Sequence, residues 1–293
     1  MNVGDVKREM MRAAVSKKAT PKPIIQRGRA QGGYVKILAY GHSGTGKTFA
    51  IKGFVENGMR VAVISTDLGG SGLASVFNAL ENEGKSNLCD NIVNMEFVDY
   101  DSLYKFLSDP ESVWPEFFDF DPDVLVWDGF SGFQQVQVTE KVLDMSPLGK
   151  NSSEAREEGL WAEQQDWGMI RNATLRGLSK FLNLHNWKTG KQIHKYVTCL
   201  ESKPSPDKLT NEVVRAPYLQ GSAQSLVGPA FDIIIETRAV KGQGDGKREI
   251  VYKYHCVGHE MLVAKSRGFD LAPVEDADMG KLWREKIAPR VKR

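Results

Sequence analysis

The arrangement of apolar and polar residues changes at Tyr34. From there, short apolar runs alternate with segments whose apolar residues recur at helical spacing. Strands that alternate with helices usually pair in parallel, because each helix carries the chain back across the sheet. The sequence therefore predicts an α/β fold whose mostly parallel central sheet is flanked by helices. The predicted strands are residues 34–40, 60–66, 123–128, 195–202 and 232–238, and the predicted helices are 47–57, 72–83 and 167–184.

The pattern differs at both ends of the chain. Toward the C-terminus, the apolar runs 248–258 and 260–267 follow each other without a helix between them, which predicts antiparallel strands before a short helix over 276–287. In residues 1–33, proline and glycine interrupt any regular period. We therefore predict an arm and linker over residues 1–33 and a single domain over residues 34–293.

Two stretches of the predicted domain lack a regular period. Residues 131–166 are polar, and residues 203–224 carry three prolines and scattered basic residues. Both are predicted to be long loops, which in compact domains are usually functional or mobile.

Composition and charge narrow the class of protein. The chain has 293 residues, 41% of them hydrophobic, yet no apolar run approaches the roughly 18 residues that cross a bilayer. No secretory signal is apparent at the N-terminus, so a cytoplasmic location and no membrane partner are expected. The three cysteines lie far apart, which favours neither a disulfide framework nor a paired-cysteine zinc site.

The basic residues are concentrated at the N-terminus. The overall net charge is +2, but residues 1–33 hold eight basic and two acidic residues, a net charge of +6. The remainder is mildly acidic. The sequence thus combines a basic arm with an acidic body.

The stretch "GHSGTGKT", residues 41–48, carries the clearest chemistry. It matches the phosphate-binding loop Gly-x-x-x-x-Gly-Lys-Ser/Thr and lies between a predicted strand and a predicted helix. Glycines let backbone N–H groups turn inward around an anion, and the helix N-terminus adds partial positive charge. Lys47 is expected to reach the β- and γ-phosphates of ATP, and Thr48 to ligate Mg²⁺. The predicted nucleotide-binding residues are Gly41, His42, Ser43, Gly44, Thr45, Gly46, Lys47, Thr48 and Phe49.

Two strand ends supply candidate catalytic carboxylates. Four apolar residues precede Asp128, the pattern of the Walker B aspartate that holds Mg²⁺ together with Thr48. Gly129 follows it, where AAA+ motors have a catalytic glutamate, so any base must come from elsewhere. Asp67 ends the strand after the phosphate loop and is a candidate for polarising the attacking water. The alternative is that Asp67 caps the next helix.

Polar residues also end two later strands. Glu201 and Ser202 end the run "YVTCLES", either sensing the γ-phosphate or simply reaching solvent. Lys265 and Arg267 lie one residue apart, so on a strand both point the same way and could meet one phosphate cluster. We treat Lys47, Asp67, Asp128, Lys265 and Arg267 as the candidate catalytic residues.

The order of these motifs resembles that of the RecA-like ATPases. More narrowly, "KILAYGHSGTGKT", "VISTDLGG", "VLVWDGF", "APYLQGSAQSLVGPAFDIIIETR" and "VAKSRGF" look like the bacteriophage-encoded RecA-core ATPases of the Sak group. The resemblance covers roughly residues 34–270. It implies a RecA-like P-loop core, ATP between subunits of a ring or filament, and Lys265 and Arg267 acting on the next subunit's γ-phosphate.

The resemblance also implies a role in phage recombination or annealing on single-stranded DNA, in the cytoplasm of an infected bacterium and beside other phage replication and recombination proteins. Lys203, Lys208 and Arg215 are the candidate DNA contacts, with Tyr218 nearby for base stacking. Because Asp67 stands where RecA has glutamate and Asp128 precedes glycine instead of serine, hydrolysis is expected to be slow or DNA-stimulated. The alternatives are an ATPase acting on a protein client, such as a clamp or helicase loader, and a nucleotide-gated scaffold that does not hydrolyse ATP.

Overall fold

The computed structural model describes residues 33–67, 72–145, 164–202, 214–242, 250–259 and 262–291. The chain divides into two units, Met1–Gly32 and Gly33–Arg293. The first unit lies outside the described residues, all of which belong to the second.

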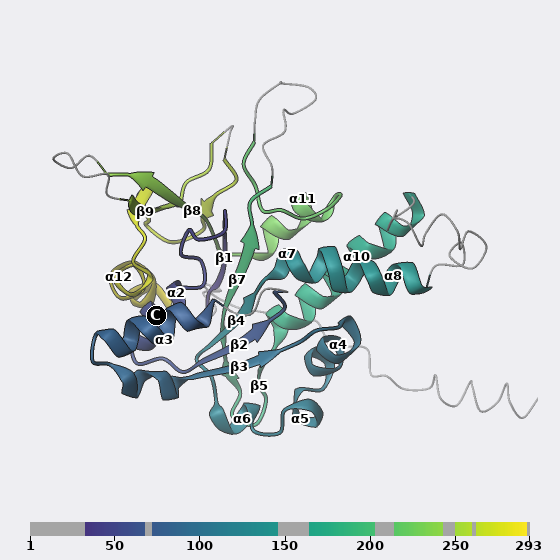
Figure 1. Ribbon diagram of the computed structural model, residues 1–293, viewed down its shortest axis with the longest axis horizontal. Helices are drawn as coiled ribbons and strands as arrows, with labels where there is room; N and C mark the ends of the chain where they lie inside the picture. The colour runs from purple at the N-terminus through teal and green to yellow at the C-terminus, as the bar shows by residue number, and fades with distance from the viewer. Residues whose placement is uncertain are drawn as a thin grey trace, which may run out of the picture. The chain divides into compact units, whose positions relative to one another are not determined.

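A nine-stranded sheet forms the centre of the second unit, with the order β11-β9-β8-β1-β7-β4-β2-β3 and with β10 also paired to β8 (Figure 1). The pairs from β3 to β8 are all parallel, whereas β9 and β10 run antiparallel to β8, and β11 runs antiparallel to β9. The predicted mostly parallel α/β sheet with antiparallel strands near the C-terminus is confirmed. The strands are β1 Lys36–Gly41, β2 Val61–Ser65, β3 Ile92–Glu96, β4 Val124–Asp128, β7 His194–Leu200, β8 Ile233–Lys241, β9 Ile250–His255, β10 Lys265–Ser266 and β11 Val274–Asp276.

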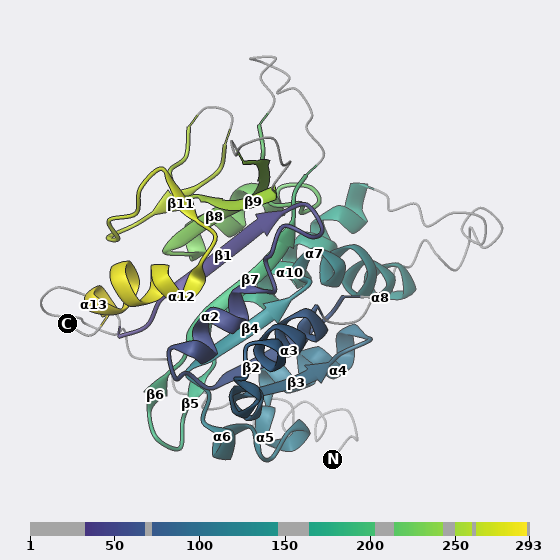
Figure 2. The ribbon, with the colours of Figure 1, turned by 60° about the vertical axis from the view of Figure 1, so that its left-hand side comes forward.

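Helices cover both faces of this sheet, because the central strands carry apolar side chains on both sides. All residues of β2 and β4 are buried. One face packs on α2 (Ala50–Glu56), α3 (Leu73–Asn82) and α12 (Met279–Leu282), which Figure 2 shows on its near side. The other face packs on α4 (Tyr100–Ser108), α7 (Phe130–Gly132), α10 (Gln164–Asn183) and α11 (Ala223–Val227).

The predicted loop over 131–166 is wrong in its first part. The chain is helical there, through α7, the π-helix Phe133–Val138 and α8 (Thr139–Met145), and α10 already begins at Gln164. The polar residues led to the wrong prediction because some of them face inward, and Gln134 and Gln137 are buried. Gln134 accepts a hydrogen bond from Gln220 N at 2.6 Å, and Gln137 donates one to Phe97 O at 2.6 Å. Hydrogen bonds to the backbone allow these amide groups to be buried, although Gln137 Oε1 has no hydrogen-bond partner among the described residues.

Several short elements were not predicted. Two of the helical ones carry readable start signals: Asp99 caps α4 by accepting from Ser102 N, and Asp109 caps α5 just before Pro110. The unpredicted elements are β3, α4, α5 (Pro110–Val113), α6 (Phe117–Phe120), α11, the hairpin β5 (His185–Asn186) with β6 (Lys191–Gln192), the 3-10 helices Ser86–Asn91 and Gly228–Ala230, and β11. At the C-terminus, α12 continues as the π-helix Trp283–Ile287 and α13 (Ala288–Val291).

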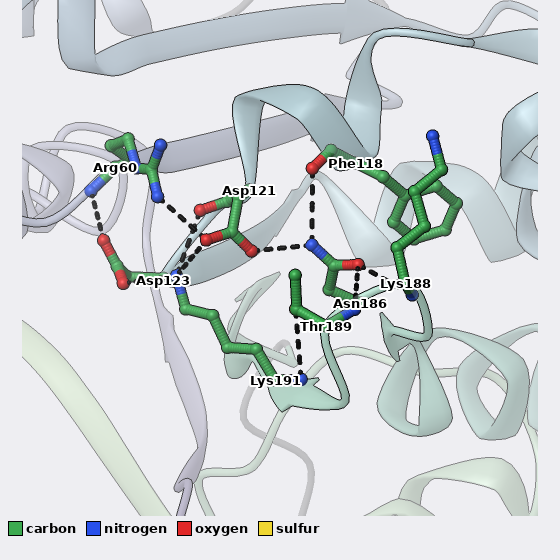
Figure 3. A network of polar contacts seen from close by, with 8 residues as sticks. All are labelled: Arg60, Phe118, Asp121, Asp123, Asn186, Lys188, Thr189 and Lys191. Atoms are coloured by element: carbon green, nitrogen blue, oxygen red, sulfur yellow. Dashed lines mark hydrogen bonds and ion pairs between the residues drawn. The ribbon is translucent and has the colours of Figure 1, made fainter.

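A polar network fastens the amino ends of β2, β4 and the β5–β6 hairpin (Figure 3). Asp121 is its centre: its carboxylate accepts from Arg60 Nη2 at 2.9 Å, Lys191 Nζ at 3.0 Å and Asn186 Nδ2 at 2.7 Å. Asp123 joins through Arg60 N at 2.8 Å and Lys191 Nζ at 2.8 Å. Asp121 has φ 46°, the left-handed conformation that aspartate and asparagine tolerate better than other non-glycine residues.

This network predicts a pH-dependent contribution to stability. Burial opposes ionisation of Asp121, but hydrogen bonds from Asn186 and Lys191 and the charges of Lys191 and Arg60 outweigh it, so the pKa of Asp121 is lowered. The carboxylate thus stabilises the fold above the unfolded-state pKa of about 3.9, and this is lost as the pH falls through the lower folded-state pKa. We expect Asp121→Asn, which keeps the backbone tolerance, to lower the free energy of unfolding by about 1–2 kcal/mol at pH 7.

Urea unfolding at several pH values measures this effect, with Asp119→Asn as the matched control. Asp119 lies on the neighbouring α6, and its side chain is 76% exposed and 3.6 Å from Lys188 Nζ, so its replacement should cost less than about 0.5 kcal/mol. The Asp121→Asn difference should shrink as the pH falls below the unfolded-state pKa of about 3.9 and on through the lower folded-state pKa. A difference that stays constant with pH would show that the ionised carboxylate is not what the network depends on.

Candidate functional site

The candidate phosphate loop joins the carboxyl end of β1 to α2, at the edge of the sheet where parallel strands end together. Gly44 and Gly46 have φ values of 76° and 86°, a conformation that side chains disfavour. Gly41 is required by packing instead, because a Cβ there would collide with the backbone oxygen of Thr237 on β8. The glycine spacing therefore has a local physical cause in this fold.

The side chain of Lys47 folds back over this loop. Its Nζ donates to Gly41 O at 2.8 Å and to His42 O at 2.7 Å, so the ammonium lies at the mouth of the loop. Burial lowers the pKa of Lys47, and the nearby carboxylates, Asp128 foremost and then Asp67, oppose this shift. An anion bound in the loop would stabilise the charged form of the partly buried Lys47.

Asp128 is placed directly against the start of α2. Its two carboxylate oxygens each lie 3.0 Å from Thr48 Oγ1, and Oδ1 also accepts from Thr198 Oγ1 at 2.6 Å. Thr198 lies on β7, between β1 and β4, and accepts from Gly129 N at 2.9 Å. The sequence identified Thr48 and Asp128, but it gave no signal for Thr198, because a threonine inside a buried strand is ordinary.

The electrostatics of Asp128 favour a neighbouring cation. Only 3% of the residue is exposed. Burial raises the pKa of Asp128 and the Asp67 carboxylate adds to this, while hydrogen bonds from Thr198 and Thr48 oppose it. A cation bound beside it would stabilise the ionised form.

The residues present fit Mg²⁺ in the manner of nucleotide sites. No group of three or more His, Cys, Asp or Glu side chains among the described residues could hold a metal ion. Mg²⁺ on a nucleotide needs fewer protein ligands, because phosphate oxygens and water complete its octahedron. The Thr48 hydroxyl and the Asp128 carboxylate, adjacent and next to the phosphate loop, are such a pair.

Asp67 lies beside Asp128, just past the end of β2. It is exposed, and its charge acts on both Lys47 and Asp128. The N-cap of α3 is Gly72, and no side chain caps that helix, so capping of α3 does not explain Asp67. Gly129, with φ 92°, is the residue that Asp67 packs against, since a Cβ on Gly129 would lie 2.9 Å from Asp67 N.

Glu201, just past the end of β7, faces the phosphate loop. Its side chain is only 4% exposed, and its Oε2 lies 3.4 Å from Nε2 of His42. Its backbone bridges to Pro217, which lies within the second predicted loop. Of the two interpretations of this strand end, the buried position beside His42 excludes a residue that simply reaches solvent.

A buried charge cluster next to the loop gave no recognisable signal in the sequence. Glu236 on β8 is fully buried, with Arg215 Nη1 at 3.2 Å and Arg238 Nη2 at 3.3 Å from its Oε1. Burial raises the pKa of Glu236 to about 6, Arg215 opposing this and Glu201 adding to it. The Tyr40 hydroxyl donates to the Arg215 carbonyl at 3.1 Å, so Arg215 is held at both its backbone and its guanidinium.

The other predicted DNA contacts are less informative. Lys203 and Lys208 lie outside the described residues. Tyr218 is 36% exposed and receives a hydrogen bond at its carbonyl from Ser131 Oγ at 2.8 Å.

Lys265 and Arg267 lie near the opposite end of the strands. Lys265 pairs with Ile234 on β8, and Arg267 N donates to Asp232 O at 2.8 Å. Ile234 is in register with Leu38 on β1, three residues before Gly41, which corresponds to about 10 Å along the strand, and Asp232 lies two residues farther from the loop. The structure therefore does not bring these cations together with the chain's own phosphate loop. Arg267 is exposed, whereas Lys265 Nζ donates to Gly228 O at 2.7 Å.

No protein-family model matches the sequence, and no curated protein matches it either. A search of the described helices finds none that combines the length and apolarity needed to cross a membrane.

Proposed function

We propose that this protein binds and hydrolyses ATP through a RecA-like P-loop core. One observation carries the proposal: Thr48 of the glycine loop meets the buried carboxylate of Asp128 at 3.0 Å, with Lys47 folded over the same loop. Residues 80 positions apart are thereby brought into contact, in an arrangement that would hold a triphosphate with its Mg²⁺. The order of the other elements supports the RecA-like resemblance.

Different residues of the chain would have different roles in ATP hydrolysis. Backbone N–H groups of the loop and Lys47 hold the β- and γ-phosphates. The oxygen of a water forms a bond to the γ-phosphorus while the bond to the bridging oxygen breaks, and ADP leaves with that electron pair. Asp67 accepts the proton released by the water. Thr48 and Asp128 would hold Mg²⁺, which when bound neutralises charge on the phosphates.

The position of Lys265 and Arg267 favours a multimer. Because Lys265 lies about 10 Å along the strands from its own loop and Arg267 lies farther still, they serve the reaction only if they reach a neighbouring subunit's γ-phosphate. ATP would then lie between subunits of a ring or filament.

Single-stranded DNA is the proposed client, on the strength of the resemblance to phage recombination ATPases. Lys203, Lys208 and Arg215 with the half-exposed Tyr218 would contact its backbone and bases. Arg215 pairs with Glu236 through Nη1, and its side chain is 19% exposed. The expected setting is the cytoplasm of an infected bacterium, beside other phage recombination proteins.

The test is ATP turnover by the wild-type protein with and without single-stranded DNA. We expect ATP turnover to be slow without DNA and to rise at least about 10-fold when single-stranded DNA is added. The reason is that bound DNA would favour the conformation in which the residues around the γ-phosphate are ordered. Turnover indifferent to DNA would favour a protein client, such as a clamp or helicase. Binding of ATP without turnover under any condition would favour a nucleotide-gated scaffold.

A further inference from the structure

Two glycines of one short turn face the same aspartate. Gly129 and Gly132 follow Asp128, and both lie against residues 66–67 at the end of β2. A Cβ on Gly129 would lie 2.9 Å from Asp67 N and 3.0 Å from Asp67 Cβ. A Cβ on Gly132 would lie 3.1 Å from Thr66 O and 3.6 Å from Asp67 Oδ1.

The two positions differ in why they are glycine. Gly129 has φ 92°, so its backbone conformation alone strongly disfavours other residues. Gly132 has φ −62° and ψ −43°, an ordinary helical conformation in which alanine is favoured over glycine by about 1 kcal/mol. What opposes a side chain at Gly132 is the closeness of the Thr66 carbonyl oxygen, which belongs to the peptide that precedes Asp67; the distance to Asp67 Oδ1 is an ordinary contact.

The backbone before Asp67 has little freedom to move away. Thr66 N donates to Asp128 O at 2.9 Å, and Thr66 Oγ1 donates to Gly129 O at 3.0 Å. The indole Nε1 of the fully buried Trp127 donates to Thr66 Oγ1 at 3.1 Å. These hydrogen bonds hold Thr66 in place. A side chain that presses on the Thr66 carbonyl therefore shifts the peptide between Thr66 and Asp67, and the exposed carboxylate of Asp67 moves with it.

We propose that Gly129 and Gly132 are positioning residues that set where the Asp67 carboxylate stands relative to Asp128 and the phosphate loop. The inference rests on the proposed function, in which Asp67 takes the proton of the attacking water. In this arrangement the residue after Asp128 is a glycine and not a catalytic carboxylate. The lack of a side chain at Gly129 lets the backbone of Asp67 approach closely, and Asp67 supplies the carboxylate. The turn that follows the metal-holding residue and the strand end that carries the base form one rigid unit.

Gly132→Ala is the sharpest probe, because its backbone conformation accepts alanine. The added methyl should displace the carboxylate of Asp67 by a few tenths of an ångström, and errors of position near 1 Å can cost about 100-fold in rate. We expect kcat to fall about 10-fold, while the Kd for MgATP stays within about 2-fold. Gly168→Ala is the control: this glycine also lies in a helix, but a Cβ there meets nothing within 4 Å.

A double-mutant cycle with Asp67→Asn shows whether the glycine acts through Asp67. If it does, Gly132→Ala lowers kcat in the wild type but causes no further loss in the Asp67→Asn background. Equal losses in both backgrounds, unchanged kcat in Gly132→Ala, or loss of its fold by circular dichroism would each overturn the inference. Failure of the proposed function looks different, because the wild type itself would then neither bind nor hydrolyse MgATP.

Discussion

Lys47→Ala is expected to abolish MgATP turnover and to weaken MgATP binding by about 100-fold. The Lys47 ammonium lies at the mouth of the loop, where it donates to Gly41 O and His42 O, and a phosphate bound in the loop would take the place of these backbone acceptors. Truncating one partner of a buried charge pair costs about 2–5 kcal/mol, and about 3 kcal/mol corresponds to the expected loss of affinity.

Calorimetry and ligand-induced stabilisation measure this loss. The wild type should gain thermal stability as MgATP is added, and Lys47→Ala should gain little at the same concentration. Lys141→Ala on α8, which removes a lysine paired with Asp101 on a different part of the fold, is the matched control and should bind MgATP as the wild type does. If Lys47→Ala binds MgATP unchanged, the loop is not a triphosphate site and the proposed function fails.

Arg267→Ala is expected to keep MgATP affinity within about 2-fold and to lose turnover by about 1000-fold. Arginines that reach a γ-phosphate from a neighbouring subunit contribute about 10³ or more to kcat, because they act on charge that develops in the transition state. Affinity should remain, since Arg267 lies near the end of the strands remote from its own loop. Arg284→Ala, an exposed arginine on the π-helix Trp283–Ile287, is the control and should be fully active.

Mixing the two inactive variants tests the action between subunits directly. In a mixed assembly, an Arg267→Ala subunit still offers an intact Lys47, and a Lys47→Ala neighbour still offers an intact Arg267, so some interfaces regain a complete site. We expect measurable turnover from the mixture and none from either variant alone. A mixture as inactive as its components, or an Arg267→Ala variant that turns over normally, would remove the role proposed for Arg267.

Local sequence patterns predicted the central strands of the sheet, the loop of residues 41–48 and Asp128. The apolar runs that became β1, β2, β4, β7 and β8 were recognisable because strands buried on both faces carry few polar residues. The edge strand β3, with Asn94 and Glu96 exposed, lacked that signal. The inward-facing Gln134 and Gln137 gave the opposite error, because their burial depends on backbone partners far along the chain.

The sequence by itself determined the loop of residues 41–48, the strand ending in Asp128 and the alternation that makes the sheet parallel, because these depend on the chemistry and spacing of neighbouring residues. Only the tertiary structure decided that Thr198 holds Asp128, that Glu236 holds Arg215, and that the backbone of Asp67 packs on Gly129. It also separated Lys265 and Arg267 from their own phosphate loop. Such relations join residues tens to hundreds of positions apart, and the order of strands in the sheet, which fixes them, is not encoded in any local period.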